Sequence, residues 1–272
     1  MRIRVVHATS YAYQTPTRSI LQVLRLTPRD YDTQHVVSWR VEADEDVRLR
    51  VDEDAFGNTV HVLWTDRPLS ALTLTVRGEV RTADAGGVVA GAVERLPLGI
   101  YRRETPLTRP DAALIELADT IAAEAGPSPL ERLHRLLTVL HQEVAFDTKA
   151  TTVTVTAAEA FALRRGVCQD IAHIFLAAAR RLGAPARYVS GHLVRQDGSV
   201  EQEAAHAWAE AHVPGLGWVG FDPTNGICPT DAYVRVAIGL DYLDAAPVRG
   251  TRQGGGEETM AVRLKVGETQ QQ

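Results

Sequence analysis

Apolar and polar residues alternate over much of residues 1–100, which is the pattern of half-buried β-strands. Many of the apolar positions carry β-branched or aromatic side chains, and these favour an extended backbone. The alternation predicts strands at residues 2–7, 22–27, 36–42, 48–51, 59–64 and 72–80. Turn-forming residues lie between them, including Gly57-Asn58 and Pro68. Short strands at such close spacing predict a β-rich, β-sandwich-like domain over residues 1–100.

Beyond residue 100 the apolar positions follow the period of a helix. Residues 111–125 are predicted to form an amphipathic helix that ends at Gly126-Pro127. Ser128 is suited to begin a second helix, because its hydroxyl can accept a free backbone N–H and Pro129 fits the first turn. Thr156-Ala157-Ala158-Glu159 matches the capping box of a short helix. An Ala-rich apolar run at residues 171–182 predicts a further helix.

Strand-like segments return after the Ala-rich helix. They lie at residues 187–193, 204–213, 218–221, 233–238 and 260–266. Pro214-Gly215-Leu216-Gly217 predicts a tight hairpin between two of them. Helices followed by consecutive strands of this kind predict an α+β fold with an antiparallel sheet over residues 101–267.

Composition and charge exclude several classes of protein. Hydrophobic residues make up 45% of the chain and charged residues 23%, as in ordinary globular domains. The net charge of -5 disfavours a nucleic-acid partner, which would require a basic face. No apolar run approaches the roughly 20 residues of a membrane-spanning helix. The N-terminus lacks the apolar segment of a signal peptide, so we expect a cytoplasmic protein with no membrane partner.

Cys168 lies directly before the Ala-rich helix, in Gly166-Val167-Cys168-Gln169-Asp170. A helix N-terminus carries about half a positive charge and unpaired N–H groups, and both favour a thiolate. The backbone N–H of Cys168 can also stabilise the oxyanion that forms when a thiolate attacks a carbonyl. The other cysteine, Cys228, lies in a loop with no helix start beside it, and two cysteines do not indicate a disulfide framework. Cys168 is therefore the candidate nucleophile.

The predicted hairpin brings a histidine and an aspartate together. His206 and His212 point to the same face of the strand at 204–213, because alternate residues share a face. If His212 lies opposite Trp218, His206 and Asp222 become diagonal neighbours with Cβ atoms somewhat under about 7–8 Å apart. A slip of one residue would put them on opposite faces, so this register is a specific prediction.

Cys168, His206 and Asp222 together predict a catalytic triad. His206 would pair with the thiolate and later protonate the leaving amine, and Asp222 would orient the imidazole ring. Each residue alone has an ordinary structural interpretation: a core cysteine, a strand histidine facing solvent and a turn aspartate. Their order and local context favour the catalytic interpretation.

Four further residues are candidate substrate-binding positions. Asp170 and His173 share a face of the cysteine helix, although Asp170 has a sufficient structural role in the first turn. Trp208 and Trp218 would flank the site, with core packing as the alternative. His192 is an additional candidate near the end of its strand.

A metal site is a rival interpretation of Cys168, His206, His212 and Asp222. Residues along a strand rise about 3.3 Å each, so two histidines six positions apart are too distant to share a metal directly. We therefore expect no metal and no cofactor.

Several segments carry a resemblance to a known family. In the second half they are Arg164-Arg165-Gly166-Val167-Cys168-Gln169-Asp170-Ile171-Ala172-His173, Ala184-Pro185-Ala186-Arg187-Tyr188-Val189-Ser190-Gly191, Ala205-His206-Ala207-Trp208 and Gly217-Trp218-Val219-Gly220-Phe221-Asp222-Pro223-Thr224-Asn225. In the first half they are Tyr11-Ala12-Tyr13 and Leu24-Arg25-Leu26-Thr27-Pro28-Arg29. The chain resembles the transglutaminase-like superfamily, a papain-like group with a Cys–His–Asp triad. It is similar to the bacterial form, which has a transglutaminase-like N-terminal region.

The resemblance implies a β-rich transglutaminase-like N-terminal domain at residues 1–100 and a papain-like cysteine catalytic domain at 101–267. It implies that Cys168, His206 and Asp222 occupy the triad positions and that the substrate is a peptide or protein. We expect a thioester intermediate resolved by water, as in a cysteine peptidase or amidase acting on a peptide, isopeptide or glutamine amide bond. Two alternatives stay open: a protein-glutamine transglutaminase with an amine acceptor, and a non-catalytic papain-like binding module.

Overall fold

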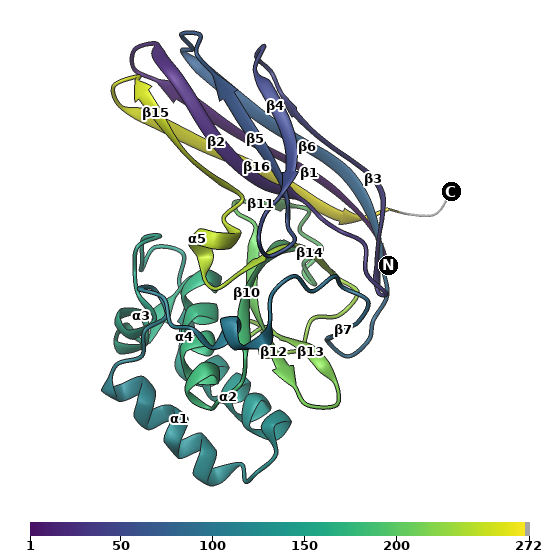
Figure 1. Cartoon of the computed structure of the whole chain (residues 1–272), viewed down its shortest axis with the longest axis vertical. Helices are drawn as coiled ribbons and strands as arrows, with labels where there is room; N and C mark the ends of the chain where they lie inside the picture. The colour runs from purple at the N-terminus through teal and green to yellow at the C-terminus, as the bar shows by residue number, and fades with distance from the viewer. Residues whose placement is uncertain (270–272) are drawn as a thin grey trace.

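The structure of the chain is a computed structural model that describes residues 1–269. Figure 1 shows a β-rich part at one end of the molecule and helices with a smaller sheet at the other. The larger sheets are antiparallel, so the predicted α+β class is confirmed. No helix within residues 1–269 is both long enough and apolar enough to cross a membrane.

Two antiparallel sheets form the β-rich part. The first has the order β11 (Glu201–Gln202), β16 (Glu258–Glu268), β1 (Arg2–Tyr13), β6 (Ala71–Thr82) and β3 (Gln34–Ala43). The second has the order β15 (Val248–Gly254), β2 (Thr17–Thr27), β5 (Thr59–Thr65) and β4 (Arg48–Glu53). Alternate residues of β1 and β2 are buried, and Leu24, Leu63 and Leu74 pack together between the sheets. The alternation in the sequence is therefore the alternation of core and surface.

The last two strands of the chain belong to these sheets. β16 pairs with β1 along its length, and β15 pairs with β2. The sequence predicts one domain over residues 101–267, whereas the structure pairs residues 248–268 with the N-terminal strands. The physical reason is that β1 and β2 would otherwise expose an edge of unpaired N–H and C=O groups. The N-terminal sandwich, meaning residues 1–82 with β15 and β16, thus includes the first and the last of the described strands.

The other part of the molecule contains the helices. They are α1 (Ala112–Glu124), α2 (Pro129–Glu143), α3 (Ala157–Leu163), α4 (Cys168–Arg181) and the short α5 (Tyr242–Ala245). The predicted caps at Ser128 and Thr156 are present, and Asp111 caps α1 in the same way: each side chain accepts a backbone N–H of the first helical turn. These starts were predictable because a cap is a local interaction.

A third sheet lies against the helices. Its order is β14 (Tyr233–Gly239), β10 (Ala186–Leu193), β12 (His206–Val213), β13 (Gly217–Phe221) and β7 (Val88–Val89). A short 3-10 helix, η1 (Leu98–Arg102), lies in the connection to α1. β8 (Ala145–Phe146) and β9 (Arg165–Gly166) form a separate parallel pair, and β9 leads directly into α4.

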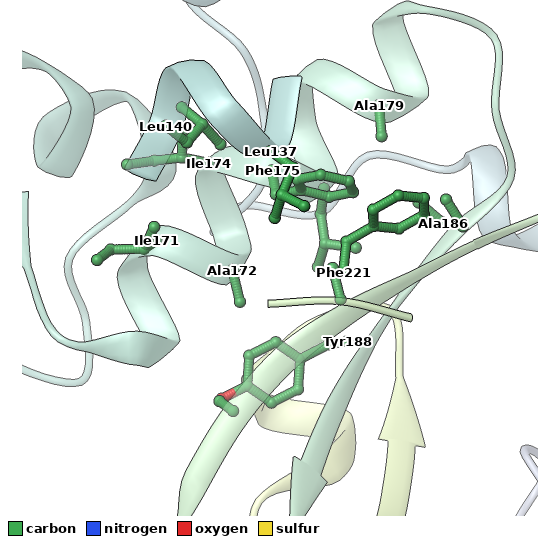
Figure 2. Close-up of a cluster of buried hydrophobic side chains, with 14 of the residues drawn as sticks. Leu137, Leu140, Ile171, Ala172, Ile174, Phe175, Ala179, Ala186, Tyr188 and Phe221 are labelled. Carbon is green, nitrogen blue, oxygen red and sulfur yellow. The ribbon is translucent and has the colours of Figure 1, made fainter. Parts of the chain in front are cut away.

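Helix α4 is enclosed by the other helices and this sheet. Figure 2 shows Ile171, Ile174 and Phe175 of α4 among the buried side chains. The ring of Phe175 stacks on Phe221 of β13, with centroids 5.2 Å apart. Small alanines on both α4 and β12 allow the helix and the sheet to approach closely, and all of them are buried. This packing fixes the N-terminus of α4 relative to the start of β12.

Candidate active site

Cys168 is the first residue of α4, as the sequence predicts. The helix is capped by Asp170, whose carboxylate accepts the backbone N–H of Val167 at 2.9 Å. Gly166 is required just before it, because a Cβ there would come within 2.7 Å of Asp170 Oδ2. Cys168 is half-buried and is a free thiol. The thiol therefore lies at the positive end of a well-anchored helix.

His206 is the first residue of β12, and the predicted register is confirmed. His212 pairs with Trp218 across the hairpin, so His206 and Asp222 lie at its open end. His206 Nε2 is 2.6 Å from Asp222 Oδ2. With Nε2 engaged by the carboxylate, the other ring nitrogen, Nδ1, is left for the thiol of Cys168.

Asp222 is fully buried and accepts hydrogen bonds on both oxygens. Oδ1 accepts the backbone N–H groups of Thr224 (3.0 Å) and Asn225 (3.3 Å). Oδ2 accepts His206 Nε2, Asn225 Nδ2 at 2.7 Å and the hydroxyl of Tyr233 at 2.7 Å. Burial alone would raise the pKa of Asp222, but the charge of His206 and these side-chain donors hold it below its usual range. The carboxylate is therefore ionised at neutral pH.

The charge of Asp222 controls the protonation of His206. Burial alone would lower the pKa of His206, but the Asp222 carboxylate and hydrogen bonds to Asp222 and Cys168 raise it to about 10. At neutral pH the imidazole is therefore protonated, and an imidazolium beside a thiol favours the thiolate. The structure brings Cys168, His206 and Asp222 together in this arrangement.

Asp170 and His173, taken from the sequence as substrate-binding candidates, are both enclosed by the protein. Asp170 also accepts the Thr151 hydroxyl at 2.5 Å, and burial raises the pKa of its carboxyl. His173 Nε2 accepts the backbone N–H of Tyr242 at 3.0 Å, and burial with the nearby Arg180 charge lowers its pKa to about 3. Their contacts secure the start of α4, the Thr151 segment and α5, and neither side chain presents a surface to a substrate.

The two tryptophans lie in different places. Trp208 is buried behind His206, with ring centroids 6.1 Å apart and planes inclined by 27°. Trp218 is buried at the turn end of the hairpin, where the Arg187 guanidinium lies 3.8 Å from the centre of its ring. Trp208 therefore supports the imidazole, whereas Trp218 packs in the core away from the triad.

The remaining candidates lie outside the triad. His192 is buried against His7 of β1, with ring centroids 5.9 Å apart. Cys228 is half-buried, and burial raises the pKa of its thiol. His212 packs edge-on against Trp218. Within residues 1–269, no group of three or more His, Cys, Asp or Glu side chains is arranged to hold a metal ion.

The side-chain partners of Asp222, Asn225 and Tyr233, are not predicted by the sequence. Asn225 follows Asp222 in Asp222-Pro223-Thr224-Asn225, a turn sequence in which an Asp carboxylate commonly accepts backbone N–H groups from the next residues. That signal could have identified the loop, although not the side-chain bond of Asn225. Tyr233 carries no such signal, because its contact depends on how β14 is placed.

The chain is similar to known proteins over most of its length. Residues 115–223 match the model of the transglutaminase-like superfamily, and residues 3–81 match that of the bacterial transglutaminase-like N-terminal region. An uncharacterized protein of Mycobacterium leprae is 30% identical over 97% of this chain and 98% of its own length. An uncharacterized protein of Mycobacterium tuberculosis is 30% identical over 92% of this chain and 87% of its own.

Two further similarities concern proteins with a named activity. A "Protein-glutamine gamma-glutamyltransferase" of Pseudomonas aeruginosa is 33% identical over 35% of this chain, which is 16% of that protein. The crystal structure of a "Putative Cysteine Protease" from Cytophaga hutchinsonii covers 100% of this chain and 92% of that chain, with a TM-score of 0.80 and 18% identity. The latter similarity supports the fold of the whole chain.

Proposed function

Because this chain belongs to the transglutaminase-like superfamily, we propose that it is a cysteine peptidase or amidase that cleaves a peptide, isopeptide or glutamine amide bond through a thioester. The observation that carries the proposal is the contact of His206 Nε2 with Asp222 Oδ2 at 2.6 Å, beside a cysteine at a helix N-terminus. A fixed imidazole beside a nucleophile is the arrangement that covalent acyl transfer requires.

The first half of the reaction forms the thioester. The Cys168 thiolate attacks the carbonyl carbon of the substrate, and the C=O electron pair moves onto the oxygen. The backbone N–H of Cys168 donates to that oxyanion. The imidazolium of His206 gives its proton to the amide nitrogen, so the C–N bond breaks and the amine leaves. Asp222 keeps His206 oriented and stabilises its charged form.

The second half releases the acid. Neutral His206 takes a proton from water, and the hydroxide attacks the thioester carbonyl. The C–S bond then breaks, the Cys168 thiolate leaves, and the imidazolium–thiolate pair is restored. The products are a carboxylic acid and the amine released earlier, so the reaction is a hydrolysis.

A second candidate function differs only in the acceptor. If an amine replaces water, it attacks the same thioester and forms a new amide bond, as in a transglutaminase. The similarity to part of the Pseudomonas aeruginosa protein-glutamine gamma-glutamyltransferase favours keeping this candidate. Hydrolysis is preferred because water is in vast excess over any amine acceptor.

A peptide library that includes glutamine-bearing peptides, incubated with and without a primary amine, separates the candidates. Product masses are compared for the wild-type protein, for Cys168→Ala and for the matched control Cys228→Ala. We expect hydrolysed products from the wild type and the control, and none from Cys168→Ala. Amine incorporation that outpaces hydrolysis at millimolar amine would replace the peptidase with a transglutaminase. A wild type that gives no product and no acyl adduct would favour the binding module.

A further inference from the structure

Strand β14 forms the edge of the third sheet, and two side chains of the N-terminal sandwich complete its hydrogen bonding. The Gln34 amide donates to the Arg235 carbonyl and accepts the Arg235 N–H, both at 2.8 Å. The Asn58 amide does the same at Ile238, at 2.7 and 2.8 Å. Both amides are buried. Each therefore mimics a neighbouring strand and holds β14 at a fixed position.

The first residue of β14 contacts the triad. Tyr233 donates its hydroxyl to Asp222 Oδ2 at 2.7 Å, and both side chains are buried. Its ring lies edge-on against Trp208, with centroids 5.4 Å apart, and 5.9 Å from the His206 ring. The segment before it is also held by the sandwich, because the N-terminal amine of Met1 lies 3.2 Å from Asp231 Oδ2.

We propose that Tyr233 is a positioning residue for Asp222 and that the N-terminal sandwich, through Gln34, holds it in place by clamping β14. The inference rests on the proposed function for its consequence in catalysis. It gives the sandwich a role in the active site, although the sandwich contributes none of the three triad residues. The chain of contacts runs from Gln34 through the backbone of Arg235 to Tyr233, Asp222 and His206.

The hydroxyl of Tyr233 also has an electrostatic effect. The hydrogen of this hydroxyl carries a partial positive charge and points at Asp222. Removing the hydroxyl leaves the negative charge of Asp222 less compensated, so the triad as a whole binds protons more tightly. Loss of a hydrogen bond to a charged group typically shifts a pKa by on the order of one unit.

The groups that face this site come from several elements. They are His206 of β12, Cys168 of α4, Cys228 and Asn225 of the loop before β14, and His141 of α2, which contacts Thr224.

The first test measures the alkylation rate of Cys168 by iodoacetamide against pH, with mass mapping, because this readout needs no substrate. In such a profile the alkylation rate rises with pH over a limited range, which we call the acid limb. For Tyr233→Phe we expect this acid limb to move to higher pH, by up to about one unit. The control Tyr11→Phe removes a hydroxyl from a tyrosine buried in the sandwich core and should leave the limb unchanged. An unshifted limb in a folded Tyr233→Phe protein would overturn the proposal, since a merely structural role changes the melting temperature and not the limb.

The second test concerns the clamp. Gln34→Met keeps the length of the side chain and removes both bonds to Arg235, so the acid limb should shift part of the way in the same direction. In the Tyr233→Phe background the same change should add no further shift. The control Gln22→Met alters a buried glutamine whose Oε1 accepts no hydrogen bond from any described residue. A full shift by Gln34→Met in the Tyr233→Phe background would show that the clamp does not act through Tyr233.

The two proposals fail in distinguishable ways. If no substrate is cleaved but the limb shifts as expected, Tyr233 positions the triad and the assigned reaction is wrong. If substrates are cleaved but the limb does not move, the reaction stands and the positioning role of Tyr233 is lost. Should Gln34→Met fail to fold, Gln34→Glu tests the clamp instead, because a glutamate keeps the acceptor for the Arg235 N–H and loses the donor to the Arg235 carbonyl; an unshifted limb in that folded variant would overturn the role of Gln34.

Discussion

The carboxylate of Asp222 accepts donors on both oxygens, and this determines what a substitution there does. In Asp222→Asn the new NH₂ group must face either the side-chain donors at Oδ2 or the backbone N–H groups at Oδ1. Neither orientation satisfies the site, and the negative charge that supports the His206 imidazolium is lost. We expect kcat/KM to fall by about 10²- to 10⁴-fold, less than for Cys168→Ala.

The pH dependence of this variant follows from the same charges. Without Asp222, burial is the dominant influence on His206, so its pKa falls from the raised value near 10. The imidazolium, and with it the enhanced alkylation of Cys168 at neutral pH, should be lost. Asp66→Asn, at an exposed aspartate in the turn between β5 and β6, is the control. Unchanged alkylation in Asp222→Asn would remove Asp222 from the triad.

At the scale of elements, the start of α4 depends on the close approach of Gly166 and Asp170. Gly166→Ala places a methyl group 2.7 Å from Asp170 Oδ2, so the capping carboxylate has to move away from Val167 N. Such overpacking typically costs about 1–3 kcal/mol of stability. We expect a lower melting temperature together with slower alkylation of Cys168.

Gly99→Ala is the matched control for this prediction. A Cβ at Gly99 would meet no atom within 4 Å, and its φ is not in the left-handed region. If both glycine variants behaved like the wild type in melting and alkylation, the cap of α4 would not be what positions the thiol.

The elements also show which features a sequence can predict. Helix starts at Ser128 and Thr156 were predicted because each cap is decided within one turn. The hairpin register was predicted from the tight turn at residues 214–217, which sets His212 opposite Trp218, and a slip of one residue would have put His206 and Asp222 on opposite faces. The pairing of residues 248–268 with β1 and β2 was not predicted, because nothing in a local pattern specifies a partner at the opposite end of the chain.

In the site, too, the features that depend on local sequence were predictable and those that depend on distant parts of the chain were not. The three triad residues could be identified from their local contexts and their order. The donors Tyr233 and Asn225 and the core position of Trp218 could not, because each depends on how separate strands are placed in three dimensions.

At the scale of the whole molecule, one buried cluster connects the sandwich with the helices. Leu264 of β16 and Ile3 of β1 belong to the same cluster as Phe175 of α4. The chain should therefore unfold in a single cooperative transition. Leu264→Ala removes a side chain that is only 1% exposed, so we expect it to lower the free energy of unfolding by about 2–5 kcal/mol.

Denaturant unfolding, followed both by far-UV circular dichroism and by Cys168 alkylation, checks this prediction. Met260→Ala on the same strand is the control, because Met260 is 61% exposed and its loss should change stability by at most about 0.5 kcal/mol. Two separate transitions, with only one of them moved by Leu264→Ala, would show that the two parts are energetically independent.

The central claim is that Cys168 is the nucleophile of an acyl transfer, and trapping the acyl-enzyme tests it most directly. The protein is mixed with a thiol-directed acyl donor, quenched in acid and mapped by mass spectrometry. We predict one acyl group on Cys168, released by hydroxylamine as a thioester is, retained in Cys228→Ala and absent in Cys168→Ala. An acyl group found on Cys228 instead, or no adduct on the folded wild-type protein, would contradict the account.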